Sequence, residues 1–170
     1  ARCQSPESMM AALALIGRDN SRTPMQWDAS RYAGFTAADA ATEPWIGVNP
    51  NHVEINAAEE FDDPGSVYSF YKKLIAMRHN NATIATGEWN LVAADSEQVY
   101  SFTRTSGDDT ILVIVNLTDK TAQVPAEVAQ LLEDGVGESQ VLLSTYDAVH
   151  SVKSVARGEL ARWEGVVIQL

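Results

Sequence analysis

The stretch "QVYSFTRTSGDDTILVIVNLT", residues 98–118, decides the fold class of the second half of this chain. Two runs rich in β-branched and aromatic residues flank the tetrapeptide "SGDD" at 106–109. This pattern predicts a β-hairpin, because a glycine-containing turn joins two segments whose side chains favour extended backbone. We therefore expect two strong antiparallel strands on either side of residues 106–109.

Further short strands are expected on both sides of this hairpin. Apolar runs bounded by turn residues occur at 88–94, 121–126, 139–145 and 165–170. Six or more strands at this spacing, without helices between them, favour an antiparallel β-sandwich. The segment "PAEVAQLLEDG" at 125–135 is expected to form one helical turn or an irregular excursion.

The first half of the chain has a different character. A short helix is predicted over residues 5–16, and Gly17 is a natural stop for it. A second helix is predicted over 63–79, with Asp63 as its cap and apolar residues at helical spacing. Between them, residues 17–61 read as irregular. An irregular run of this length is usually functional or packed against another part of the protein.

Composition and charge exclude several classes of protein. The formal net charge is −11, and a polyanionic partner such as nucleic acid or an acidic membrane would be repelled by it. The longest apolar runs are too short to span a bilayer. No signal-peptide pattern is visible, so we expect a cytoplasmic location. Because the chain starts at Ala1 and not at Met, we expect a processed protein or a piece of a longer one.

Cysteine and histidine usage gives no sign of a metal or redox site. The single cysteine, Cys3, excludes a disulfide within the chain. The three histidines, His52, His79 and His150, are far apart and lack metal-ligand spacing. No metal and no cofactor are therefore expected.

The acidic clusters at 59–63, 108–109 and 133–134 precede a helix or fall in turns, which favours structural roles over catalysis. The chain has no nucleophile elbow and no glycine-rich phosphate loop. That leaves "GRDNSRTPMQWDAS", residues 17–30, as the stretch most suited to ligand binding. Arg18 offers five donors in a rigid plane, and Trp27 could supply a flat face for a sugar ring. The alternative is that the polar residues here only tie down a long loop.

A series of motifs then points to a family. In order along the chain they are "GRDNSRTPMQWD", "AGFT", "PWIGVNPN", "INA" and "SVYSFYKKLIAMRHNN". Together they resemble the C-terminal third of α-glucosidases, and in particular the oligo-1,6-glucosidases of the α-amylase superfamily. The resemblance is strong to about Gly87 and continues more weakly to Leu170.

This resemblance implies both a fold and a mechanism. Members have a catalytic (β/α)8 barrel followed by a C-terminal antiparallel Greek-key β-sandwich. It implies that residues 1–81 are the end of the barrel, including its last helix, and that 82–170 are the sandwich. The implied activity is retaining, exo-acting hydrolysis of terminal α-glucosidic bonds by carboxylates on barrel strands. Those carboxylates would precede this chain, so the chain by itself is expected to hold no catalytic residue and to be inactive.

One binding residue is implied by the same resemblance. Arg18 matches the arginine of the family's "RDN" motif, which reaches the terminal glucose at the nonreducing end. The implied partners are an α-glucosidic oligosaccharide and, within the complete enzyme, the missing barrel. Arg22, Gln26 and Asp28 match the motif too and are interpreted as scaffold for the loop.

Two other functions remain open from the residues. A sucrose isomerase or transglucosylase of the same superfamily shares nearly all of these motifs, although Met25 favours a glucosidase because the isomerases tend to have Phe there. A free-standing carbohydrate-binding or structural module is the second alternative. It would use exposed aromatic side chains such as Trp89, Tyr100 or Trp163.

Overall fold

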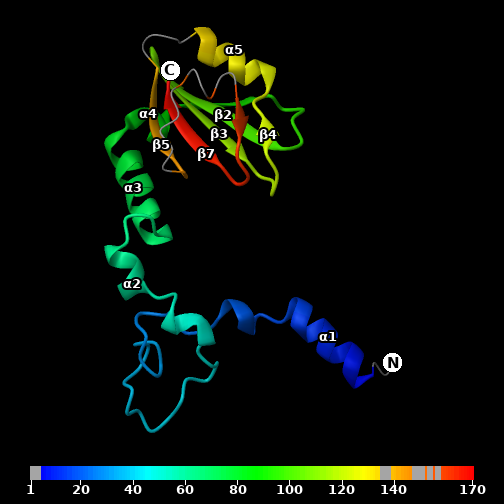
Figure 1. Ribbon diagram of the computed structural model, residues 1–170, viewed down its shortest axis with the longest axis vertical. Helices are drawn as coiled ribbons and strands as arrows, with labels where there is room; N and C mark the ends of the chain where they lie inside the picture. Colours follow the sequence, from blue (N-terminus) through cyan, green and yellow to red (C-terminus); the bar gives the residue numbers. More distant parts are fainter. Residues whose placement is uncertain (1–4, 135–138, 147–151, 153–154, 156–157) are drawn as a thin grey trace. The chain divides into compact units, whose positions relative to one another are not determined.

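The computed structural model describes residues 5–134, 139–146, 152, 155 and 158–170. The chain divides into two compact units, Ala1–Lys72 and Lys73–Leu170 (Figure 1). Cys3 and His150, which carried expectations about redox and metal chemistry, lie outside the described residues. No helix in the described part of the chain combines the length and the hydrophobicity that crossing a membrane needs.

The first unit consists of short helices joined by long loops. These are α1 (Pro6–Ile16), the 3-10 turns η1 (Asp19–Ser21) and η2 (Pro50–Val53), α2 (Ala57–Asp62) and the start of α3 (Val67–Asn80). Helix α1 confirms the helix expected over residues 5–16. Its cap is Ser5, whose hydroxyl accepts a hydrogen bond from the Ser8 N–H at 3.2 Å. None of its residues is buried, and Leu15 is 87% exposed.

Helix α3 begins later than the sequence predicted. It starts at Val67, and Asp63 is not its cap. The Asp63 carboxylate instead accepts from the Gly65 N–H at 2.8 Å and closes a local turn. The Ser66 hydroxyl then accepts from the Ser69 N–H at 3.1 Å and takes over the capping role.

Helix α2 lies within the run that was expected to be irregular. Its cap is Asn56, whose side-chain oxygen accepts from the Glu59 N–H at 3.1 Å. An Asn followed three residues later by Glu is a signature of a helix start, so the sequence does carry a local signal for α2.

The second unit is built around one antiparallel sheet with the strand order β1-β2-β3-β7-β5 (Figure 1). Its strands are β1 (Glu88–Val92), β2 (Val99–Ser106), β3 (Asp109–Asn116), β5 (Gln140–Ser144) and β7 (Gly165–Gln169). A two-stranded ribbon of β4 (Ala122–Gln123) and β6 (Glu159–Leu160) and the helices α4 (Ala82–Thr86) and α5 (Ala126–Asp134) complete it. The predicted hairpin is confirmed: Ser106 pairs with Asp109, and Gly107 takes a positive φ of 61° in the turn.

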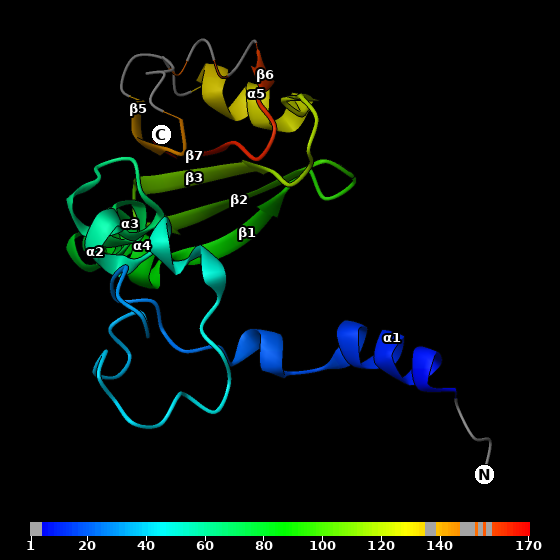
Figure 2. The same ribbon diagram turned by 60° about the horizontal axis from the view of Figure 1, so that its bottom comes forward.

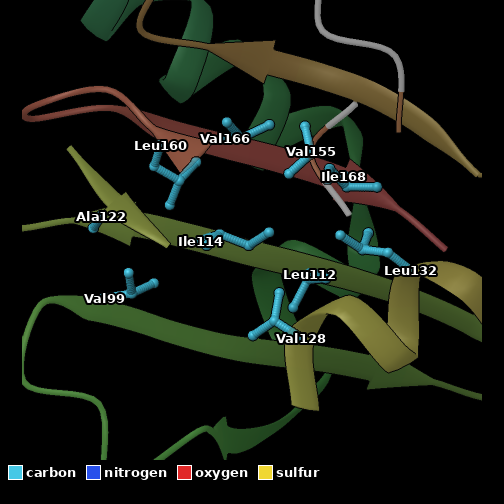
Figure 3. Packing of buried hydrophobic residues seen from close by; sticks show 10 residues of the cluster. All are labelled: Val99, Leu112, Ile114, Ala122, Val128, Leu132, Val155, Leu160, Val166 and Ile168. Carbon is cyan, nitrogen blue, oxygen red and sulfur yellow. The ribbon is translucent and has the colours of Figure 1, made fainter. Parts of the chain in front are cut away.

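The hydrophobic core lies on one face of this sheet (Figure 3). Leu112 and Ile114 of β3 and Ile168 of β7 are fully buried there. The ribbon and α5 cover them (Figure 2). Burial explains why α5 forms about two and a half turns and not the single turn expected, since Val128 and Leu132 occupy one helix face and both reach the core.

The fold class is therefore mainly antiparallel β, preceded by helical and loop segments, as the sequence predicted. The layer that faces the sheet across the core is the β4–β6 ribbon with α5. A complete Greek-key sandwich and the domain boundary between residues 81 and 82 stay predictions.

Candidate functional site

Arg18 stands at the junction between helix α1 and the loop that follows. Gly17 ends the helix, and its N–H donates to the Leu13 carbonyl at 2.7 Å. The Arg18 backbone carbonyl then accepts from the Ser21 hydroxyl at 2.8 Å and from the Ser21 N–H at 3.1 Å. The backbone that carries Arg18 is thus held by a tight 3-10 turn.

The Arg18 side chain itself is exposed and forms no hydrogen bond or ion pair with any described residue. Arg31 in the same unit differs, because its guanidinium lies 3.4 Å from Glu43 and 4.7 Å from the Tyr32 ring centroid. All five donors of the Arg18 guanidinium are therefore open to a ligand or to another part of the protein. The side chain of Arg22 also has no contact among the described residues, so its scaffold role stays a prediction.

The loop after Arg18 is fastened to a segment about thirty residues further along the chain. The Gln26 side-chain amide donates to the Ile55 carbonyl. The Gln26 backbone carbonyl accepts from the Ala57 N–H at 2.9 Å, and Trp27 accepts from Ala58 at 3.0 Å. These three bonds agree with the expected scaffold role of Gln26 and explain how so long a loop keeps a defined course.

Asp28 closes a second turn in this loop. Its carboxylate accepts from the Ser30 N–H at 2.8 Å, and Gly34, which packs against the carboxylate, has a positive φ of 65°. The Ser30 hydroxyl and the Ser30 N–H hold the pKa of Asp28 below its usual range, and the positive field of His52 acts in the same direction.

A pH dependence follows from this lowered pKa. The folded carboxyl has the lower pKa, so its contribution to stability is present above the unfolded value of about 4 and is lost as the pH falls through the folded pKa. We expect Ser30→Ala to raise the Asp28 pKa, measured by NMR titration of the side-chain carboxyl carbon. An Asp28 midpoint that is the same in both proteins would contradict this role of the Ser30 hydroxyl.

A pocket of about 330 Å³ opens beside the loop. Residues 23–26 and 55–57 form its walls, together with Glu60 and Tyr68. The Glu60 carboxylate accepts from the Tyr68 N–H at 3.1 Å. Glu60 thus serves as a local acceptor at the start of α3, which agrees with the structural role expected for the acidic cluster at 59–63. Its place in a pocket was not foreseen, because it depends on the α2–α3 turn.

The remaining candidates lie apart from this loop in the sequence. Among the described residues, no three His, Cys, Asp or Glu side chains come together as a group that could hold a metal ion. Trp89, Tyr100 and Trp163 of the second unit are 46%, 42% and 57% exposed. The first two lie on neighbouring strands, whereas Trp163 lies in the turn between β6 and β7.

Comparison with known proteins identifies the class to which this fold and loop belong. The sequence model of the family "Alpha amylase, catalytic domain" matches residues 1–87. This range includes Arg18, the loop that follows it and helices α1 to α4. The chain therefore belongs to the α-amylase family of glycoside hydrolases.

Proteins similar to this chain include an oligo-1,6-glucosidase, a trehalose-6-phosphate hydrolase and a trehalulose synthase. The oligo-1,6-glucosidase of Parageobacillus thermoglucosidasius is 37% identical over 98% of this chain. The crystal structure of a trehalose-6-phosphate hydrolase from Bacillus licheniformis has a TM-score of 0.81 at 33% identity, and that of a trehalulose synthase variant in complex with glucose has 0.79 at 34%. Both structures match 98% of this chain. The chain spans 28% of the length of each of these three proteins.

Proposed function

We propose that this chain is the carboxyl-terminal part of a retaining, exo-acting α-glucosidase that hydrolyses terminal α-1,6 bonds of short oligosaccharides. One observation carries the proposal. The similarity to the oligo-1,6-glucosidase extends over 98% of the chain, through both units. In this proposal residues 1–81 end the catalytic barrel, and residues 82–170 form the Greek-key sandwich that follows it.

Within the proposed enzyme, Arg18 binds the terminal glucose. Its backbone carbonyl is held by the 3-10 turn that follows, and its guanidinium is free of contacts with the described residues. A planar group with five donors suits the vicinal hydroxyls of a sugar, and a binding group for the outermost hydroxyls favours action at chain ends. The rest of the catalytic domain would supply the nucleophile and the general acid, so we expect no hydrolysis by this chain alone.

The surface of the first unit supports its place at the edge of a larger domain. Helix α1 is apolar on all sides, and yet none of its residues is buried. In the part of α3 that belongs to the first unit, the side chains of Val67 and Tyr71 are also more than half exposed. A helix that is hydrophobic all round is normally buried. The missing barrel would cover these surfaces.

Trypsin provides a test of this packing. We expect rapid cleavage after Arg18, Arg22 and Arg31 in the isolated chain, since all three are exposed and lie outside regular helices and strands. Arg104 lies within the sheet and should be cut at least about tenfold more slowly. Peptide mapping of a time course measures both rates, and protection of all three loop arginines would contradict the proposal.

The activity is tested on the complete protein encoded by the reading frame that contains this chain. We expect it to release glucose from isomaltose, and we expect the 170-residue chain to release none. A reading frame that starts directly before Ala1 would contradict the enzyme proposal and would favour the carbohydrate-binding or structural module. Binding of isomaltose to the isolated chain, followed by tryptophan fluorescence, would support that module.

The likeness to trehalulose synthase favours a second candidate, a sucrose isomerase or transglucosylase. The chain is similar to enzymes of both kinds, so the products must separate the two candidates. Sucrose incubated with the complete protein should yield glucose and fructose or remain intact if the first proposal holds. Formation of trehalulose or another sucrose isomer would favour the second candidate.

A further inference from the structure

The turn between β6 and β7 holds Trp163 in a backbone conformation that large residues rarely adopt. Its φ is 57°, and the residue is 57% exposed. The Glu164 N–H donates to the Ala161 carbonyl at 3.1 Å, so residues 161–164 form a β-turn with Trp163 at its third position. Glycine and asparagine are the usual residues at a positive φ, because a larger side chain strains the backbone there. Core packing does not explain a tryptophan at this position, since more than half of it is exposed.

Buried polar groups hold the turn in this conformation. Asn116 and Glu164 are both buried, with exposures of 0% and 2%. The Asn116 side-chain amide donates to the Ala161 carbonyl at 2.8 Å, and the Glu164 carboxylate accepts from the Ala161 N–H at 2.6 Å. The Trp163 N–H donates to the Thr118 carbonyl at 3.0 Å. A strained residue persists where its surroundings fix it in this way, and such residues cluster at ligand-binding and active sites.

Two further exposed residues belong to the same turn. The Tyr146 hydroxyl donates to the Arg162 carbonyl at 2.7 Å, so the Tyr146 ring lies beside the peptide that joins Arg162 to Trp163. Tyr146 is 40% exposed. The Arg162 side chain is exposed too, and its guanidinium forms no hydrogen bond or ion pair with any residue in the described part of the chain. We call these three residues, Tyr146, Arg162 and Trp163, the turn platform.

The turn platform has the chemistry of a carbohydrate site. An indole ring offers a flat apolar surface to the C–H face of a glucose ring, and a guanidinium offers paired donors to vicinal hydroxyls. Sites for small ligands combine apolar rings with a few convergent polar groups in this way. The other exposed rings of the sheet unit differ. Trp89 is paired with Arg104, whose guanidinium already donates to the Ala85 carbonyl, and Tyr100 is paired with Val115, which has no polar side-chain group. Of these three places, only the turn platform combines an exposed indole with a guanidinium that is free of described residues.

We infer that the turn platform binds an internal segment of an α-glucan chain, with one glucose ring on the Trp163 indole and its hydroxyls on the Arg162 guanidinium. A ring on an exposed turn contacts a chain from one side only, so it does not select chain ends. In this respect it differs from Arg18, for which we propose binding of the terminal glucose. A polymer with many internal segments should therefore bind better than a disaccharide. The residues themselves specify a sugar ring, and the choice of an α-glucan rests on the proposed function.

Affinity electrophoresis of the 170-residue chain in native gels that contain dextran, a polymer of α-1,6-linked glucose, tests this inference. We expect dextran to retard the chain, and Trp163→Gly to raise the dissociation constant at least about tenfold. Glycine accepts a positive φ without strain, so this variant should keep or raise the urea midpoint of the chain while it loses the ligand. Arg162→Ala should weaken binding as well. Trp89→Thr is the matched control, because it removes another exposed tryptophan and should leave the retardation unchanged.

A mobility that dextran does not change would overturn the inference. Equal retardation of the parent chain and of Trp163→Gly would do the same, since dextran would then bind elsewhere. A clearly lower urea midpoint for Trp163→Gly would show that the tryptophan stabilises the turn, and this would remove the argument from strain. A dimer of the parent chain that Trp163→Gly abolishes in sedimentation velocity would assign the turn platform to a second copy.

The proposed function is tested separately. Binding of dextran by the sheet unit requires no catalytic domain, whereas release of glucose from isomaltose by the complete protein does. Retardation by dextran together with hydrolysis of isomaltose would support both proposals. Retardation without hydrolysis would leave the sugar site in place and contradict the enzyme proposal.

Discussion

Replacing Arg18 with alanine should lower kcat/KM for isomaltose about a hundredfold in the complete enzyme. The guanidinium forms no other contact among the described residues, so its hydrogen bonds would go to substrate. Hydrogen bonds to a charged group contribute about 1.5–3 kcal/mol each. A loss of about 2.7 kcal/mol in transition-state binding corresponds to a hundredfold decrease. Steady-state kinetics on isomaltose and on 4-nitrophenyl α-glucoside would measure it.

Two further variants separate sugar binding from loop folding. Arg22→Ala removes an arginine four residues away from the same loop and should change kcat/KM little. Arg18→Lys keeps the charge but loses the planar pair of donors, so we expect an intermediate decrease. A kcat/KM unchanged in Arg18→Ala, or an equal loss in Arg22→Ala, would rule out a specific role of Arg18 in binding glucose.

Replacing Leu112 with alanine should destabilise the sheet unit by about 3–5 kcal/mol. Leu112 is fully buried in the middle of β3, and the core cluster that contains it includes Val128 and Leu132 of α5. Removing three carbon atoms there leaves a cavity that the surrounding strands cannot close, because their backbone is held by ladder bonds on both sides. Urea denaturation of the isolated chain, followed by circular dichroism, measures the change in the free energy of unfolding.

The matched control is Leu117→Ala. Leu117 follows the same strand but is 59% exposed, so its truncation should cost less than about 0.5 kcal/mol. Similar losses for the two leucines would show that β3 does not carry the core in solution. A small effect of Leu112→Ala with an unchanged denaturant slope would lead to the same conclusion.

Much of the first unit was predictable because its signals are local. Ser5 and Gly17 cap the two ends of α1, and both can be recognised from the residues next to them in the sequence. The errors at α2 and α3 concern competing local bonds. Asp63 was a good candidate cap, but Gly65 takes its carboxylate and Ser66 starts the helix. Propensity ranks such residues similarly, so only the structure shows which of them is used.

The sequence indicated where in the chain the candidate site lies, but not which hydrogen bonds hold its loop. The motif resemblance singled out Arg18, whose side chain is exposed in the structure; its role in binding stays a prediction. The bonds that hold the loop join Gln26 to Ile55 and Trp27 to Ala58, and neither pair follows from a pattern within one segment. The pocket beside the loop depends on the same long-range pairing. These features require the path of the whole loop, which the sequence does not reveal.

The sequence by itself determined the β2–β3 hairpin, because alternating β-branched residues and a glycine at the turn act over a few neighbouring residues. It also determined that Arg18 follows a helix end. Only the tertiary structure decided that α5 is a full helix, since burial of Val128 and Leu132 against the sheet outweighs weak local preference. Side-chain alternation sorts residues onto two faces, and only the packing of α5 and the ribbon shows which face becomes the core.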